Sequence, residues 1–175
     1  MSISTDIKGA RLVEASEELR PQLVAMAVEY EAAGDARYRE IIEDFEGYLR
    51  GLARYSAGVG LPPGHVPSSN FFLVHDGEVV GHGALRHRLS PALEHEGGHI
   101  GYDVRPSARR RGYGTLILAL MLERARNLGL SRALLTCDTD NTASARIIER
   151  NGGALAGRAV SHRSGKLISQ YWIEL

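Results

Sequence analysis

The sequence predicts a mixed α/β fold in one domain that spans residues 1–175. Strand-like and helix-like segments alternate along the chain, and a β-α-β unit occupies its second half. The 175 residues suffice for one hydrophobic core and are too few for two comfortable ones. With 43% hydrophobic and 24% charged residues, the composition excludes disordered, collagen-like and coiled-coil proteins.

The first third of the chain is expected to be mainly helical. Residues 11–14 have the pattern of a short strand, and residues 17–33 carry apolar side chains at helical spacing up to Gly34. A second amphipathic helix is expected over 36–55. The segment 56–70 is rich in glycine and proline, which indicates a loop, and its length would let it cover a ligand.

Strands and helices are expected to alternate in the rest of the chain. Asp76-Gly77 favours a tight hairpin turn, and Gly129 ends a nearly all-round apolar helix. That helix and the strands beside it form the β-α-β unit, in which a parallel strand pair is expected. The expected strands are 71–75, 78–88, 98–105, 132–137, 154–162 and 167–174, and the expected helices are 112–128 and 141–150.

The charges of the chain balance, because 21 basic side chains face 21 acidic ones. Neither nucleic acid nor an anionic membrane is therefore expected as a partner, and any anion site must be a local cluster. The longest apolar run, 116–122, is far shorter than the roughly 20 residues of a membrane span. Residues 1–6 lack the pattern of a signal peptide, so a cytoplasmic location is predicted.

One cysteine, Cys137, is present in the sequence. An internal disulfide and a cysteine-based metal site of ordinary spacing are therefore excluded. We expect Cys137 to be a small buried strand residue and not a nucleophile.

A glycine- and arginine-rich loop over 106–115 separates an expected strand from an expected helix. Gly112 and Gly114 let the backbone approach a ligand where unpaired N–H groups of the helix point outward. Guanidinium groups pair with phosphate by directed hydrogen bonds, so a diphosphate is favoured over a carboxylate. A dinucleotide fingerprint would need glycine at Ile117, and no Gly-Lys-Ser/Thr of a P-loop occurs. The arginines of this region are Arg105, Arg109, Arg110 and Arg111.

Two motifs in this order resemble the GNAT acetyltransferase superfamily. Its R/Q-x-x-G-x-G/A hallmark is met by Arg109-Arg-Arg-Gly112-Tyr-Gly114, and its N-x-x-A/S helix start by Asn141-Thr-Ala-Ser144. Residues 99–107 and 134–141 also look like a subgroup described as predicted acetyltransferases. The resemblance implies a GNAT-like central, twisted mixed sheet of six or seven strands, with helices on both faces. It also implies transfer of an acetyl group from acetyl-CoA, as co-substrate, to an amine by direct attack in a ternary complex.

The resemblance implies a set of residues that bind acetyl-CoA. The backbone of 102–104 would meet the pantetheine arm, the loop 110–115 would cradle the pyrophosphate, and Asn141 would lie near the thiol. The full expected set is Tyr102, Asp103, Val104, Arg109, Arg110, Arg111, Gly112, Tyr113, Gly114, Thr115, Asn141 and Ser144.

The catalytic residues are less evident. Acetyl transfer to an amine needs a base, an oxyanion donor and an acid, and the Val104 N–H is the natural donor if its strand splays from its neighbour as in GNAT folds. The usual tyrosine acid and glutamate base of the family are replaced by Ile148 and Thr136. Three alternatives follow: another residue acts as acid or base, water relays the proton while positioning supplies most of the rate, or the protein binds acyl-CoA without catalysis, as a sensor or partner subunit. The candidate replacements are Tyr102, His99 and Glu96.

The acceptor is expected to be a small-molecule or peptide amine. Acidic side chains over 29–46 favour a cationic acceptor, whereas Arg86, His87 and Arg88 favour one with a carboxylate or phosphate. The two hints conflict and leave the acceptor open. The oligomeric state is open as well, a homodimer included.

A rival motif, H-E-x-x-H, covers His95 to His99 and is typical of zinc peptidases. That site needs both histidines on one face of a continuous helix. Gly97-Gly98 costs about 2 kcal/mol of helix propensity relative to two alanines and leads into a strand. The zinc reading is therefore disfavoured, and no metal is expected.

Overall fold

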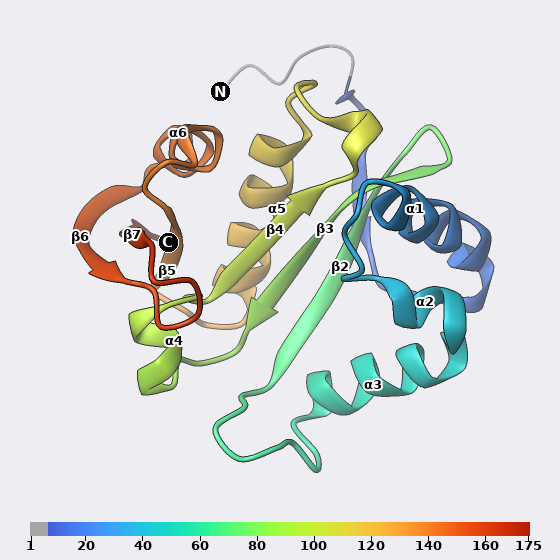
Figure 1. Ribbon diagram of the computed structural model, residues 1–175, viewed down its shortest axis with the longest axis horizontal. Helices are drawn as coiled ribbons and strands as arrows, with labels where there is room; N and C mark the ends of the chain where they lie inside the picture. Colours follow the sequence, from blue (N-terminus) through green and yellow to red (C-terminus); the bar gives the residue numbers. More distant parts are fainter. Residues whose placement is uncertain (1–6) are drawn as a thin grey trace.

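The computed structural model describes residues 7–175, and the segment 1–6, on which the signal-peptide prediction rests, lies outside them. The described chain has the predicted mixed α/β class (Figure 1). Its elements are β1 (Arg11–Val13), α1 (Arg20–Ala32), α2 (Arg39–Glu43), α3 (Phe45–Ala57), β2 (Ser68–His75), β3 (Glu78–Arg86), α4 (Pro91–His95), β4 (Ile100–Val104), α5 (Tyr113–Asn127), β5 (Arg132–Asp138), α6 (Thr142–Arg150), β6 (Ala154–Val160) and β7 (Leu167–Glu174), with short 3-10 turns at Glu17–Leu19 and Pro106–Ala108.

The seven strands of residues 7–175 form two antiparallel sheets, ordered β1-β2-β3-β4 and β5-β7-β6. The single sheet with a parallel pair, expected from the sequence, is thus divided between β4 and β5. These strands meet at one end only, where the His99 N–H donates to the Leu134 carbonyl (2.7 Å), and they diverge from there (Figure 1). Gly98 lies at this junction with φ +62, and a Cβ on it would lie 2.2 Å from the Leu134 oxygen. Glycine at position 98 thus permits the close approach of the two strands at this end.

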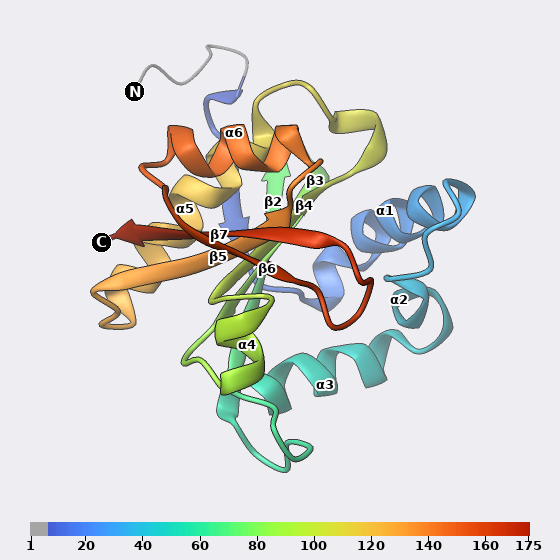
Figure 2. The same cartoon turned by 60° about the vertical axis from the view of Figure 1, so that its left-hand side comes forward.

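Helices cover both faces of the first sheet. Figure 2 shows α5 and α6 on one side of β4 and α1 to α3 on the other. Side-chain alternation along β2 explains the two layers: Phe71 and Leu73 join the apolar cluster around α5, whereas Phe72 joins the cluster around α1 and α3. Strand β4 contributes Ile100, Tyr102 and Val104 to the cluster around α5, and Asp103 lies on its other face.

Two helices show how local chemistry decides the boundaries. The helix expected over 36–55 is divided at Asp44, which leaves helical geometry and caps α3 by accepting a hydrogen bond from the Gly47 N–H (2.8 Å). Helix α5 is apolar nearly all round because it is packed between the sheets and α6, with Ile117, Leu118 and Met121 fully buried. Within residues 7–175, no helix combines the length and apolar character needed to cross a membrane.

Candidate active site

A cleft of about 480 Å³ opens where β4 and β5 diverge. Its walls come from β3 and β4 on one side and from the end of β5 and the start of α6 on the other. Tyr102 and Asp103 line it from β4, and Asn141 and Ser144 line it from α6. The division of the sheet therefore creates a cavity lined by four of the predicted residues, whereas Val104, the loop 109–115, His99 and Glu96 lie outside its lining.

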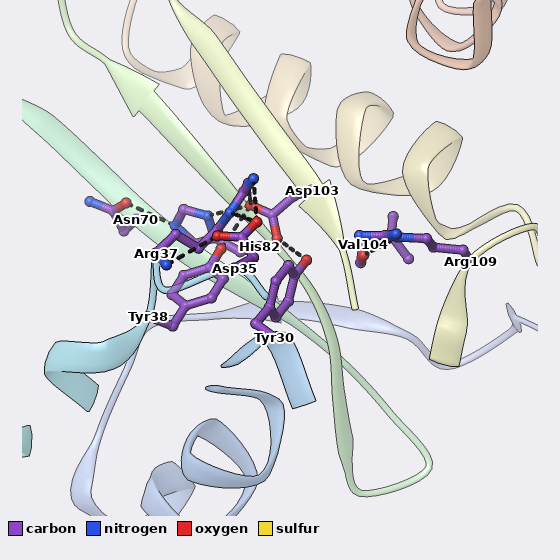
Figure 3. A network of polar contacts seen from close by, with 9 residues as sticks. All are labelled: Tyr30, Asp35, Arg37, Tyr38, Asn70, His82, Asp103, Val104 and Arg109. Atoms are coloured by element: carbon purple, nitrogen blue, oxygen red, sulfur yellow. Dashed lines mark hydrogen bonds and ion pairs between the residues drawn. The ribbon is translucent and has the colours of Figure 1, made fainter. Parts of the chain in front are cut away.

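The open edge of β4 offers backbone N–H groups to this cleft. The Arg105 N–H donates to Val80 (3.0 Å), and the His99 carbonyl accepts from the Arg86 N–H (2.8 Å). Because the groups of an antiparallel strand alternate in direction, the N–H groups of Tyr102 and Val104 point away from β3, toward the gap. The Val104 carbonyl on this edge accepts from Arg109 Nε (3.2 Å; Figure 3). The edge can thus donate to an extended ligand or to a developing oxyanion.

The loop before α5 has the backbone shape of an anion site. Arg110 (φ +63) and Gly112 (φ +89) both adopt the left-handed conformation, and Gly112 immediately precedes α5. A Cβ on Gly112 would meet only an Ile7 methyl at 3.8 Å, so its conformation, not crowding, calls for glycine. Gly114 differs, since a Cβ there would lie 2.8 Å from an Ile147 methyl of α6. The loop therefore presents the N-terminal N–H groups of a 15-residue helix outward.

The side chains in and next to this loop differ in their contacts and exposure. Arg105 is not free, because its Nε pairs with Glu29 of α1 and so ties the loop to the helical layer. Arg110 and Arg111 are exposed beside the helix N-terminus. The Tyr113 ring is buried, and its hydroxyl is hydrogen bonded to His75 Nδ1 (2.7 Å). Tyr113 can therefore serve a ligand through its backbone alone.

Tyr102 reaches across the cleft to α6. Its hydroxyl lies 2.9 Å from Ser144 Oγ, and the Asn141 side chain caps α6 by accepting from the Ser144 N–H (3.0 Å). Burial raises the pKa of Tyr102 to about 12, so its hydroxyl keeps its proton at neutral pH. Three predicted residues from two elements are thus brought together, with a proton donor among them.

A second cluster lies on the opposite face of β4, centred on Asp103 (Figure 3). Its Oδ1 accepts from the Tyr30 hydroxyl (2.5 Å) and its Oδ2 from the Tyr38 hydroxyl (2.7 Å). His82 Nδ1 lies 3.4 Å from Oδ2, and Arg37 Nη1 lies 3.7 Å from it. The other ring nitrogen of His82 donates to Asn70 Oδ1 (2.9 Å). The cluster brings side chains from α1, β2, β3, β4 and the segment before α2 to one carboxylate.

These contacts keep Asp103 ionised. Burial by itself would raise its pKa, but His82 in its protonated form and the hydroxyls of Tyr30 and Tyr38 stabilise the carboxylate and lower the pKa below its ordinary value. Burial and the neighbouring carboxylate raise the pKa of both tyrosines far above the ordinary value, so they act as permanent donors. The cluster can hold a cation or take up a proton through the His82–Asp103 pair.

His99 and Glu96 link segments at the closed end of the cleft. His99 is buried, its Nδ1 accepts from the Leu134 N–H (3.0 Å), and burial with two nearby arginines lowers its pKa. Glu96 accepts from Ser161 Oγ (2.9 Å) and from Arg163 Nε (3.0 Å) in the β6–β7 loop. His99 Nδ1 and Glu96 Oε1 thus help to hold strands and loops together.

The family's usual acid and base positions have structural contacts here. Ile148 is buried in the core beneath α6. The hydroxyl of Thr136 accepts a hydrogen bond from the Gly97 N–H (2.9 Å) and so holds the turn before β4. Neither side chain can take part in proton transfer as a tyrosine or a glutamate would.

The H-E-x-x-H match does not form the helical zinc site. Helix α4 ends at His95, Glu96 is extended, and Gly97 and Gly98 both have positive φ. His95 donates to the Val160 carbonyl (2.8 Å), whereas His99 is engaged with Leu134. No three His, Cys, Asp or Glu side chains of residues 7–175 are grouped to hold a metal ion.

Sequence reasoning missed four members of the Asp103 cluster as functional candidates: Tyr30, Tyr38, Asn70 and His82. They share no motif and belong to different elements. Asp103 itself was a signal, because a carboxylate within an otherwise apolar strand needs hydrogen-bond or charged partners when it is buried. Which distant residues supply them depends on the tertiary fold.

Comparisons with known proteins agree with this geometry. The sequence model of the acetyltransferase (GNAT) family matches residues 37–153. No protein of curated function gives a significant sequence match. Among solved structures, the chain resembles RimL, a ribosomal L7/L12 alpha-N-protein acetyltransferase in complex with coenzyme A (19% identity, 96% of this chain and 95% of that chain, TM-score 0.72).

Two further structures share the fold. Mycobacterium smegmatis RimJ, in complex with CoA-disulfide, has 18% identity over 94% of this chain and 81% of that chain, with a TM-score of 0.73. The microcin C7 self-immunity acetyltransferase MccE, in complex with acetyl-CoA and AMP, has 13% identity over 96% and 93%, with a TM-score of 0.70. At these identities the likeness concerns the fold.

Proposed function

The chain belongs to the acetyltransferase (GNAT) family, and from this premise we propose how its residues carry out acetyl transfer from acetyl-CoA to an amine. The observation that carries the proposal is the open edge of β4, which lies beside the outward-facing N-terminus of α5. A backbone edge and a helix N-terminus suit the two ends of one elongated, diphosphate-bearing ligand.

The residues that would hold acetyl-CoA fit that ligand. The loop 109–115 offers the N–H groups ahead of α5, in a backbone shape that Gly112 permits, together with exposed guanidinium groups. The Tyr102 and Val104 N–H groups would bind the pantetheine arm and the thioester oxygen, and Asn141 and Ser144 would border the sulfur. Bound there, acetyl-CoA supplies the activated acetyl group.

Tyr102 and Val104 are our choice for the acid and the oxyanion donor. The Val104 N–H lies on the unpaired edge of β4, where it needs no particular side chain. The Tyr102 hydroxyl retains its proton at neutral pH and lies beside Ser144 at the start of α6. Its protonated state suits the donation of a proton to a departing thiolate. His99 and Glu96 would support the site by fixing its closed end.

We assign the base to the His82–Asp103 pair. An amine must lose a proton as it attacks, and this pair lines the cleft on the face opposite α5. Asp103 is held ionised by its donors, so it can stabilise positive charge on His82 or on the amine. The pair replaces the glutamate that Thr136 cannot provide.

Binding and turnover test the proposal separately. A saturating concentration of CoA, about 100 times Kd, should raise Tm by roughly 5–10 °C. The wild-type chain should acetylate at least one amine of a panel, and the free CoA thiol that the reaction releases measures the rate. A Tm shift without turnover of any amine would favour the non-catalytic sensor, and the absence of both would refute the proposal.

The acceptor, the location and the assembly complete the proposal. RimL is named for acting on ribosomal protein L7/L12 and MccE for microcin immunity, so the fold accommodates different acceptors. We infer a small-molecule or peptide amine as the acceptor and a cytoplasmic location, where acetyl-CoA is available. A homodimer is a further prediction, which sedimentation of the purified chain will test.

A further inference from the structure

The floor of the cleft has charges of opposite sign at its two ends. His82, Ala84 and Arg86 alternate on one face of β3, and the ladder places His82 beside Asp103 and Ala84 beside Gly101. All five residues line the cleft. Asp103 therefore marks one end and Arg86 the other, with two small residues between them.

Arg86 is a cation without an acidic partner among residues 7–175. One nitrogen, Nη1, donates to the Gly97 and Gly98 carbonyls (3.0 Å each), and the remaining N–H groups of the guanidinium have no partner within that range. Burial, and then the like charge of Arg163, lower its pKa. A half-buried guanidinium with free donors is suited to bind a carboxylate through two parallel hydrogen bonds.

Arg163 adds a second positive charge at the same end. It lines the cleft from the β6–β7 loop, its side chain is 78% exposed, and its Nε donates to Glu96. The two arginines together outweigh the single negative charge of Glu96. This end of the cleft is therefore positive, whereas at the other end Asp35 is paired with Arg37 and the Asp103 carboxylate is the surplus charge.

The floor between the two ends is open. A Cβ placed on Gly101 would meet no atom within 4 Å, and Ala84 beside it has only a methyl group. His82 and Arg86 are four strand residues apart, which corresponds to about 13 Å. The cleft can therefore take an extended molecule whose two ends carry opposite charges.

We propose that the acceptor is an amine that also carries a carboxylate, with the amine toward Asp103 and the carboxylate on Arg86 and Arg163. This inference rests on the proposed function and names its substrate class. The length of the floor favours a molecule in which several bonds separate amine and carboxylate over an α-amino acid. Of the basic residues noted in the sequence, Arg86 lines the cleft, whereas the negative end comes from Asp103 and not from the acidic side chains over 29–46.

Matched acceptors test the charge requirement. The probes are ω-amino acids of four to eight carbons, each paired with the alkylamine of the same length. We expect at least one ω-amino acid to show kcat/KM about tenfold or more above its alkylamine, as a charged hydrogen bond provides. Equal values for every pair, or a preference for the alkylamines, would overturn the inference.

Three variants locate the carboxylate. Arg163→Gln should raise KM for the preferred ω-amino acid several-fold more than KM for the alkylamine of the same length. Gly101→Val should raise KM for both, because it fills the floor without meeting a neighbour. Arg158→Gln, an exposed arginine of β6 outside the cleft, is the matched control and should change nothing. An Arg163→Gln effect of the same size on the alkylamine would contradict the assignment.

Ligand-observed NMR in the presence of CoA separates this inference from the proposed function. If no amine is acetylated but the ω-amino acid binds more tightly than its alkylamine, and loses that advantage in Arg86→Gln, the proposed activity fails and the carboxylate site stands. If amines are acetylated without any preference in binding or turnover, the activity stands and the carboxylate site is refuted. Circular dichroism and the thermal unfolding curve of Arg86→Gln verify that the variant keeps the overall fold.

Discussion

The two faces of β4 make different kinds of site from neighbouring residues. Toward α5 and α6, the groups offered to a ligand are mostly backbone N–H groups on a free strand edge and at a helix N-terminus. Toward α1 and α2, they are side chains from several elements that converge on Asp103 (Figure 3). A backbone site depends on conformation and tolerates most side chains, whereas a side-chain site depends on each of its members. Substitutions should therefore act differently on the two faces.

The largest effect is expected from a glycine of the backbone site. Gly112→Glu places a side chain and a negative charge at the α5 N-terminus, in a conformation that glycine favours, and should abolish the Tm shift with CoA. Gly129→Glu is the matched control, since Gly129 also has positive φ (+91) in open space but lies at the other end of α5. Both variants should lose about 1 kcal/mol of stability or more. Retention of the CoA shift in Gly112→Glu would disprove the backbone site.

Removing the carboxylate of the side-chain site should affect the acceptor and spare the cofactor. Asp103→Asn should lower kcat/KM for the amine about 100-fold, which is within the range of a lost acid–base group. The affinity for CoA should stay within about twofold, because the altered side chain lies on the opposite face of β4 from α5. Asp140→Asn, in an exposed position beyond β5, serves as the control. Equal losses in acceptor and CoA affinity would show that the faces are not independent.

Tyr102 tests whether the backbone face also needs one side chain. Tyr102→Phe should lower kcat about 100-fold with little change in KM for acetyl-CoA, if the hydroxyl protonates the thiolate. Ser144→Ala keeps that hydroxyl and removes its partner, so its effect should be much smaller. Because the pKa of Tyr102 is raised to about 12, wild-type kcat should show no loss from its ionisation up to about pH 10. A kcat of Tyr102→Phe equal to wild type would assign the proton to water.

The smallest effect concerns stability at low pH. The pKa of Asp103 is lower in the folded than in the unfolded chain, so its ionised form stabilises the fold above the unfolded value. That contribution is lost as the pH falls through the folded pKa. Urea unfolding of wild type and Asp103→Asn should therefore show a difference at pH 6 that shrinks below about pH 4. A difference independent of pH would indicate that the carboxylate charge does not contribute.

The fold class and the anion loop could be predicted because they are encoded by neighbours in sequence. Arg109, Gly112 and Gly114 lie within six residues of each other, and the apolar periodicity of α5 is also a local pattern. The break of the helix at Asp44 was missed, since a cap competes with an otherwise helical pattern. The division of the sheet at β4 and the partners of Asp103 arise from long-range contacts, such as the 73 residues between Tyr30 and Asp103. The periodicity of apolar residues along the sequence carries no information about such a contact.

Gly98 lies at the point where β4 and β5 are joined. It directly precedes His99, whose N–H donates to the Leu134 carbonyl, and even a methyl group on Gly98 would lie 2.2 Å from the Leu134 oxygen. Strand β4 continues for five residues, about 16 Å, beyond this point, and it lines the cleft along most of this length. Because Gly98 has no Cβ, β4 and β5 can approach closely at the joined end of the cleft that Tyr102 spans to reach Ser144.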